Sequence, residues 1–290
     1  MLSVPRTHGI VLSVTALACA LIAGSCARSD IDDATPQVTG AVGVEVVRTD
    51  RPPTGYEVTF RLDAPDASAV GLVGDVYFTD PDNVTRTLSH DARLGDEWRQ
   101  GDVSHPLVAQ PPARLLRGDD GVWEITTAMP AGTYSYGFVE GECDRAALCV
   151  GHPDPSNPPP FLDVPGAGRQ RTSQVFVPMH PDFPTYDVAF EATVPVDSRG
   201  EVMHRTYPSA VSVDPPGEHS LGVYLPAGYD ASRAAPYPLL VLSHGMGENE
   251  TGWFADGRAA QILDHAIAAG QIPPVVMVTT DFNGLVSGPA

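Results

Sequence analysis

The stretch Y-P-L-L-V-L-S-H-G-M-G, residues 237–247, decides how the second half of this chain folds. Its apolar run begins at Pro238 and ends at Ser243, a length that suits a strand with both faces covered by other parts of the protein. Gly245 and Gly247 follow the run, and glycine allows close backbone approach and unusual φ values. We therefore predict a buried strand over 238–243 that ends in a glycine-containing loop.

A helix and a second strand are predicted after this loop. Residues 253–269 carry apolar side chains at spacings of three and four, which indicates an amphipathic helix. These side chains are Ala259, Ile262, Leu263, Ala266 and Ile267. Gly270 ends the predicted helix, and Pro273-Pro274 blocks its continuation. The run 275–278 predicts a second buried strand, so the two strands should lie parallel across a helical crossover. Upstream, 200–207 and 219–226 are predicted as two more strands.

The first half of the chain has a different pattern. Short runs rich in β-branched and aromatic residues alternate with glycine- and proline-containing turns. The predicted strands are 44–47, 56–62, 70–74, 122–126 and 134–139. Such spacing is typical of an antiparallel sandwich. We accordingly predict a β-sandwich over residues 40–168.

The order of the motifs in this half resembles a known domain. F-R-L-D-A-P (60–65), V-G-L-V-G-D (70–75), P-A-G-T-Y-S-Y-G-F-V-E-G (130–141) and D-P-S-N-P (154–158) follow one another. They resemble the immunoglobulin-like domain that precedes the catalytic domain in secreted esterases, and are similar to modules of starch-branching enzymes. Four aromatic residues could serve as core residues, the interpretation we favour, or as a sugar-stacking platform. They are Trp98, Trp123, Tyr134 and Tyr136.

The second half resembles the putative esterase family, which is similar to enterochelin esterase, feruloyl esterase and esterase D. The resemblance rests on four motifs in order, V-Y-L-P-A-G-Y-D (223–230), 237–247, W-F-A-D-G-R-A-A-Q-I-L-D (253–264) and P-P-V-V-M-V-T-T-D (273–281). The family has the α/β-hydrolase fold. The expected fold is therefore an immunoglobulin-like β-sandwich followed by the N-terminal part of an α/β-hydrolase sheet over residues 186–290.

The resemblance also implies a role for the loop that follows the first buried strand. In the family, a backbone N–H of this loop stabilises the negative oxygen of the tetrahedral intermediate. The matching positions are Gly245 and Met246, with His244 as a structural companion. The alternative is a plain turn between strand and helix. Implied substrates are acyl esters or glycan esters, and no cofactor is expected.

The groups that would attack an ester are missing from the sequence. No G-x-S-x-G occurs, although a serine esterase of this fold needs that nucleophile elbow, followed by an acid and a histidine. Ser243 and His244 are adjacent on an extended strand and face opposite ways, so they make a poor nucleophile and base. The histidines show no zinc-binding spacing, and no metal site is expected.

We therefore predict an esterase-like protein that stops before its catalytic triad and is inactive as given. A truncated gene, a degenerate paralogue, or a second chain that carries the other half would each explain this. The alternative function is a non-catalytic carbohydrate-binding surface module with a vestigial hydrolase tail.

The N-terminus predicts export. Arg6 precedes an apolar run over 10–24, which has the length of a signal-peptide core and is short for a membrane span. The run leads into A-G-S-C, which resembles a lipobox that would make Cys26 a lipidated terminus, although leucine is more usual where Ala23 stands. Ordinary cleavage after Ala27 is the alternative. We thus predict a signal peptide at 1–26, a flexible tether at 27–39, and an extracytoplasmic protein that meets the membrane only through its lipid anchor.

The charge of the chain bears on its partners, and its cysteines bear on its covalent structure. The net charge is −19, from 36 acidic and 17 basic residues, which argues against nucleic acid as a partner. Cys143 and Cys149 are separated by five residues, and in an exported protein they are expected to form a local disulfide.

Overall fold

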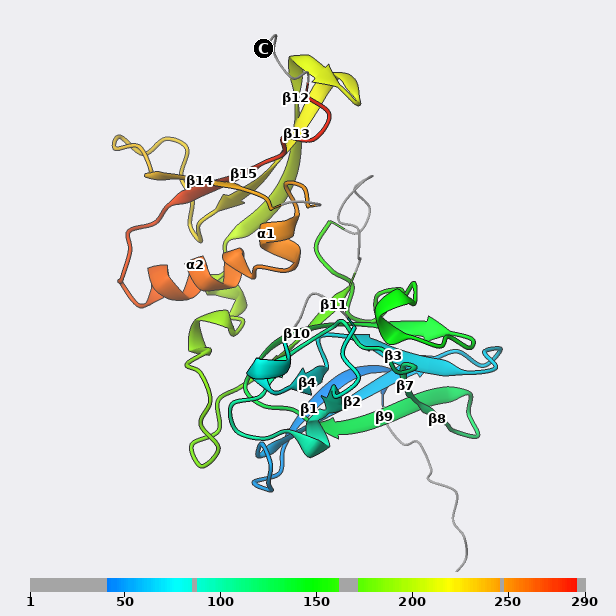
Figure 1. Ribbon diagram of the computed structural model, residues 1–290. Coiled ribbons are helices and arrows are strands. Elements are labelled where there is room, and N and C mark those ends of the chain that lie inside the picture. The colour runs from blue at the N-terminus through cyan, green and yellow to red at the C-terminus, as the bar shows by residue number, and fades with distance from the viewer. Residues whose placement is uncertain (1–40, 85–87, 162–171, 246–247, 286–290) are drawn as a thin grey trace, which may run out of the picture. The chain divides into compact units, whose positions relative to one another are not determined.

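The computed structural model describes residues 41–84, 88–161, 172–245 and 248–285. The predicted signal peptide, the predicted lipidation site Cys26 and the predicted tether at 27–39 lie outside these residues. Most of the described secondary structure is β-strand, with two short α-helices (Figure 1). None of the helices in the described part of the chain is both long and apolar enough to cross a membrane.

Three antiparallel sheets form the first half of the described chain. The first has the order β1 (Gly43–Arg48), β2 (Tyr56–Asp63), β9 (Val122–Ala128) and β8 (Leu116–Arg117). The second has the order β11 (Ser173–Val177), β10 (Gly132–Glu140), β3 (Val70–Gly74) and β7 (Ala113–Arg114). A small third sheet contains β5 (Arg93–Leu94), β4 (Tyr77–Thr79) and β6 (Val103–Ser104). The 3-10 helices are Pro81–Asn83, Gly95–Glu97, Ala146–Leu148, Ala189–Glu191 and Val196–Ser198.

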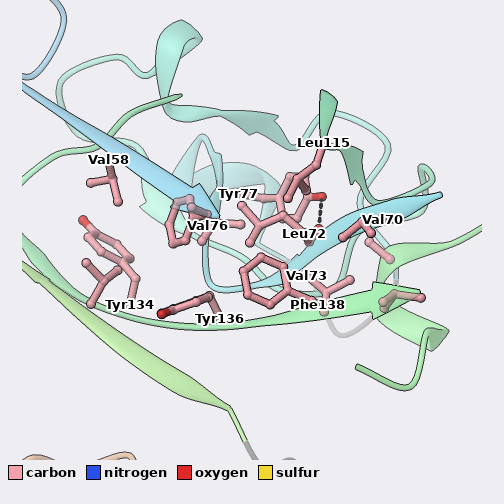
Figure 2. Close-up of a cluster of buried hydrophobic side chains, with 14 of the residues drawn as sticks. Val58, Val70, Leu72, Val73, Val76, Tyr77, Leu115, Tyr134, Tyr136 and Phe138 are labelled. Atoms are coloured by element: carbon pink, nitrogen blue, oxygen red, sulfur yellow. Dashed lines mark hydrogen bonds between the residues drawn. The ribbon is translucent and has the colours of Figure 1, made fainter. Parts of the chain in front are cut away.

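One hydrophobic core is shared by these sheets. The buried side chains of β2 and β9 meet those of β3, β10 and β11 in a single cluster, part of which is drawn in Figure 2. Phe60 on β2 and Tyr136 on β10 are in edge-to-face contact across the two large sheets, with ring centroids 4.8 Å apart. The Tyr77 hydroxyl donates to the Leu72 carbonyl at 2.8 Å, so its polar end is satisfied inside the core (Figure 2). The strands of the two large sheets therefore face each other across this core. β2 is buried on both faces from Val58 to Leu62, whereas the period-two pattern of residues 56–62 predicts only one buried face.

The four aromatic residues singled out in the sequence are core residues. Trp98, Trp123, Tyr134 and Tyr136 are all buried, and each polar tip has a partner inside the protein. A side chain with its ring face buried cannot stack on a sugar, so the stacking platform that these residues could have formed is absent. The interpretation as core residues therefore holds.

The disulfide that the sequence predicts is present in the structure. The Sγ atoms of Cys143 and Cys149 are bonded, and their Cα atoms lie 6.1 Å apart. The bridge closes the turn that contains the 3-10 helix Ala146–Leu148.

A fourth sheet and two helices form the second half. The strand order is β12 (Glu201–Val213), β13 (Pro216–Leu225), β15 (Val276–Thr280) and β14 (Leu239–Ser243). The helices are α1 (Gly252–Ala255) and α2 (Ala259–Ala268). β13 pairs antiparallel with both β12 and β15, whereas β14 and β15 are parallel. The predicted parallel crossover is thus confirmed, and the order in space differs from the order in the chain because β15 lies between β13 and β14.

The single helix predicted over 253–269 is wrong in one respect. The chain breaks it between α1 and α2, where Arg258 has a φ of 47°. This left-handed conformation cannot continue a right-handed helix, because it turns the next backbone N–H away from the preceding turn. Apolar periodicity does not report such a break, since the stripe begins only at Ala259, the first residue of α2.

The strand at 238–243 was expected to be covered on both faces, and this prediction is also wrong for the described residues. Leu240 and Leu242 pack against the core cluster of this half. In contrast, Leu239 is 63% exposed and Val241 is 54% exposed. Helices α1 and α2 lie on one side of the sheet in Figure 1, so the described chain supplies cover for only that face.

Candidate functional site

The ends of the two parallel strands build the candidate site. Ser243 at the end of β14 is in register with Thr280 at the end of β15. The residues that follow, His244 and Asp281, therefore leave the sheet at the same edge. In open α/β sheets, ligands bind at the carboxyl ends of parallel strands, where the following loops leave the sheet.

His244 holds the beginning of the β14 loop. Its ring is buried, and its Nε2 lies 2.9 Å from Oδ1 of Asp281. Its Nδ1 lies 2.7 Å from the Gly245 carbonyl oxygen, and because a carbonyl can only accept, Nδ1 is the donor there. The ring also stacks on Phe282 with centroids 3.7 Å apart. These contacts use both ring nitrogens and one ring face, so His244 is held as part of the loop.

Ser243 and His244 do not form a catalytic pair. The hydroxyl of Ser243 lies 3.0 Å from the hydroxyl of Thr280 on the neighbouring strand. The imidazole of His244 lies against Asp281 instead, with Nε2 2.9 Å from Oδ1. Another histidine, His219, donates from Nε2 to the Asp281 carbonyl at 2.8 Å. Both histidines thus anchor the segment after β15.

A pocket of about 350 Å³ opens beside this loop. Its lining includes Gly245, whose backbone is exposed, together with His244 and Trp253. A Cβ added at Gly245 would meet no atom within 4 Å, so the backbone there is not packed against other groups. The indole Nε1 of Trp253 donates to the Ser243 carbonyl at 2.9 Å, which fixes the indole at the pocket wall. Met246, the other predicted oxyanion donor, lies outside the described residues.

Two carboxyl groups line the same pocket and carry its negative charge. Glu248 comes from the loop after β14, and Asp256 follows α1. The side chain of Asp256 reaches solvent, but the surrounding protein removes part of the water that would hydrate its carboxylate. The negative charge of Glu248 also disfavours ionisation of Asp256. Together these effects raise the pKa of Asp256 to about 6.

The raised pKa of Asp256 leads to a pH-dependent prediction. A carboxyl with a folded-state pKa above its unfolded value favours the folded state at low pH, and this advantage is lost as the pH rises through about 6. Asp256→Asn should therefore unfold at a higher temperature than the wild type at about pH 8, with a smaller difference at about pH 4.5. Thermal unfolding at the two pH values measures this. A difference that grows as the pH falls would contradict the assignment.

Sequence reasoning did not assign roles to two carboxylates that the structure places here. Asp281 pairs with His244, and Glu250 is buried against β12 and β13. A signal for Asp281 was available, because an acidic residue directly after a parallel strand lies at the ligand-binding edge of the sheet. No comparable signal marks Glu250. Among the described residues, no group of three or more His, Cys, Asp and Glu is arranged to hold a metal ion.

The second half therefore contains an α/β unit with an exposed glycine backbone and a pocket at the carboxyl edge of its parallel strands. Residues 212–288 match the family described as "Putative esterase". The resemblance predicted from the four motifs is thus confirmed over this range.

Known relatives match short stretches of the chain. It is 41% identical over 91 residues to endo-1,4-beta-xylanase Y of Acetivibrio thermocellus, which is 31% of this chain and 8% of that protein. It is 46% identical over 69 residues to an endo-1,4-beta-xylanase/feruloyl esterase of Xylanibacter ruminicola, covering 21% of this chain and 10% of that protein. The match therefore spans about a tenth of the length of these relatives.

A solved structure is similar over 38% of this chain. It is a mutant of the feruloyl esterase module from Clostridium thermocellum complexed with sinapinate. The identity is 34% and the TM-score 0.30, over 38% of this chain and 34% of the other.

Proposed function

We propose that this chain contributes the oxyanion-binding part of a serine-dependent carboxylic ester hydrolase. The observation that carries the proposal is the exposed Gly245 backbone, at the end of a parallel strand and on the wall of a pocket. The match of residues 212–288 to the esterase family supports the same chemistry.

The proposed role of the loop follows from the charge that ester hydrolysis develops. Attack on the ester carbonyl places a negative charge on its oxygen, and a fixed backbone N–H stabilises this charge without having to reorient. The amides of Gly245 and Met246 are the proposed donors. His244 would hold the loop through its bonds to Asp281 and to the Gly245 carbonyl.

The nucleophile is proposed to lie outside this sequence. Because the 290 residues contain no G-x-S-x-G, we expect them to release no p-nitrophenolate from an activated acyl ester above a heat-denatured control. A longer protein that continues this chain with such a motif, or a second chain that carries it, would supply the serine. Turnover by the isolated chain would contradict this part of the proposal.

The proposed architecture is an immunoglobulin-like sandwich over 40–168 and the N-terminal part of an α/β-hydrolase sheet over 186–290. The two-layer core supports the first part, and the sheet order β12-β13-β15-β14 with its parallel pair supports the second. We also propose that the protein is extracytoplasmic, with Cys26 as its lipid anchor. The disulfide between Cys143 and Cys149 supports an oxidising compartment.

The proposed substrates are aromatic acyl esters of the feruloyl type. Two of the relatives described above are named as feruloyl esterases. In this chain, Trp253 offers an aromatic wall beside Gly245 in the same pocket. An aromatic acyl group could lie against the indole while its carbonyl oxygen faces the Gly245 amide.

Binding of ferulate tests the site in the chain as it stands. At about pH 5, where Asp256 is largely protonated, ferulate should shift the ¹⁵N–¹H resonance of Gly245 and quench Trp253 fluorescence in a saturable way. Coniferyl alcohol has the same aromatic skeleton without the carboxylate, so it should shift the Gly245 amide resonance far less. Trp253→Phe should remove the fluorescence response, because Trp98 and Trp123 are buried in another core.

Either of two results would contradict the proposed site. One is saturable ferulate binding that leaves the Gly245 amide unperturbed. The other is an equal response to the neutral alcohol, because binding would then owe nothing to an oxyanion.

A further inference from the structure

Glu250 is a buried carboxylate in the segment that joins the β14 loop to α1. Only 3% of its surface is exposed. Burial of a charged group is costly unless hydrogen bonds replace the lost water, so such a residue is retained where it is well paired. Its bonding partners therefore indicate what it does.

The Glu250 side chain binds two different strands through one oxygen. Ser220 on β13 donates its hydroxyl to Oε1 at 2.6 Å. His204 on β12 brings its Nε2 to the same Oε1 at 2.7 Å, and because a carboxylate can only accept, Nε2 is the donor. The loop after β14 is thus tied to both strands on the far side of β15.

The backbone of Glu250 is held by a third strand. The hydroxyl of Thr279 on β15 donates to the Glu250 carbonyl at 2.5 Å. Gly222 on β13 lies beneath the same point, where an added Cβ would come within 3.1 Å of that carbonyl and within 2.7 Å of the Phe254 ring. The loop therefore sits directly on the sheet, and a side chain at 222 would lift it.

We propose that Glu250 is a positioning residue that sets the place of the Gly245 amide relative to the sheet. The loop is held at its start by His244 and Asp281 and at its end by Glu250. The two ends are joined directly, because the Glu248 N–H donates to the Gly245 carbonyl at 3.3 Å. This inference rests on the proposed function, because it gives Glu250 its role through the oxyanion site. Glu250 itself does not line the pocket.

The shared oxygen makes the proposal testable with matched variants. Glu250→Gln keeps an oxygen that can accept from both donors, so it should behave nearly as the wild type. Glu250→Met has a similar volume but no strong acceptor, and it should leave Ser220 and His204 unpaired. Glu250→Asp is one methylene shorter and should not reach both donors. A role in charge alone would instead make the glutamine variant as defective as the methionine variant.

Amide hydrogen exchange of the loop and the Gly245 resonance are the main readouts, and neither requires a ligand. In Glu250→Met, exchange of the peptide covering residues 244–251 should rise about tenfold or more, with a shifted Gly245 amide. Exchange in β13, β15 and the sandwich strands should stay at the wild-type level. Ferulate affinity should fall about tenfold in the same variant and be restored in Glu250→Gln.

The outcomes separate this inference from the proposed function. If the wild type does not bind ferulate at Gly245, the proposed function fails, yet the exchange and resonance measurements still test the positioning role. Unchanged loop exchange and an unmoved Gly245 amide in Glu250→Met would overturn the inference, as would a uniform rise in exchange throughout β12–β15. If Glu250→Met does not fold, Ser220→Ala removes one of the two donors and should produce a smaller change confined to the same loop.

Discussion

Replacing Tyr224 by alanine is expected to lower the free energy of unfolding of the α/β unit by about 4 kcal/mol. Tyr224 on β13 is fully buried and packs in one cluster with Phe254, Leu263 and Met277. Its hydroxyl also donates to Oδ1 of Asp264 at 2.8 Å. The alanine variant would lose the ring contacts and the hydrogen bond from the hydroxyl. The buried Asp264 carboxylate would keep the bond from the Gly200 amide at 2.8 Å.

Tyr224→Phe separates the two contributions. It keeps the ring and removes the hydroxyl, so it should lose about 2 kcal/mol, the usual worth of a hydrogen bond to a charged group. Tyr207→Ala is the matched control, because Tyr207 lies on the paired strand β12 and is 39% exposed. Urea unfolding followed by amide exchange in β13 and β15 measures the effect on this unit. Equal losses in Tyr224→Ala and Tyr207→Ala would contradict the core assignment.

The second large effect is expected at Asp154, a buried carboxylate in the first half of the chain. Its Oδ2 accepts from the Tyr136 hydroxyl at 2.7 Å, and its Oδ1 accepts from the amide and hydroxyl of Ser156 at 2.8 and 2.6 Å. Asp154→Ala would leave these donors without their acceptor inside the protein. We expect it to lower the free energy of unfolding of this half of the chain by about 3 kcal/mol.

Graded variants show whether the Asp154 bonds carry this stability. Asp154→Asn keeps the volume and one accepting oxygen, so its loss should fall between those of the wild type and the alanine variant. Asp66→Ala, at an exposed turn of the same half, should change stability by less than about 0.5 kcal/mol. Thermal unfolding followed by near-UV circular dichroism reports on the buried aromatic residues. An alanine variant as stable as Asp66→Ala would exclude a structural role for the carboxylate.

Strand positions could be predicted because they depend on short-range pattern. The strand predicted over 56–62 is β2 (Tyr56–Asp63), although it is buried on both faces and not on one. The apolar run at 238–243 corresponds to β14. It is parallel to β15, as expected for two strands joined by a helix. The pairing of Cys143 with Cys149 was also a local inference, because few residues separate them.

The polar contacts of the site could not be predicted in the same way. Glu250 meets His204 across 46 positions of the chain, and His244 meets Asp281 across 37. Such contacts depend on sheet order and register, which place β15 between β13 and β14. A shift of one residue in the register of β12 would turn His204 to the opposite face of the sheet, away from Glu250.

Local periodicity, turn residues and ordered motifs were enough to establish the strands, the parallel crossover and the esterase resemblance, because each is written into neighbouring positions of the chain. Packing settled the rest: the break before α2, the exposed face of β14 and the burial of Asp154 and Glu250. These features depend on which segments meet in space, and the free energy of burying a charge depends on partners that are distant in the sequence.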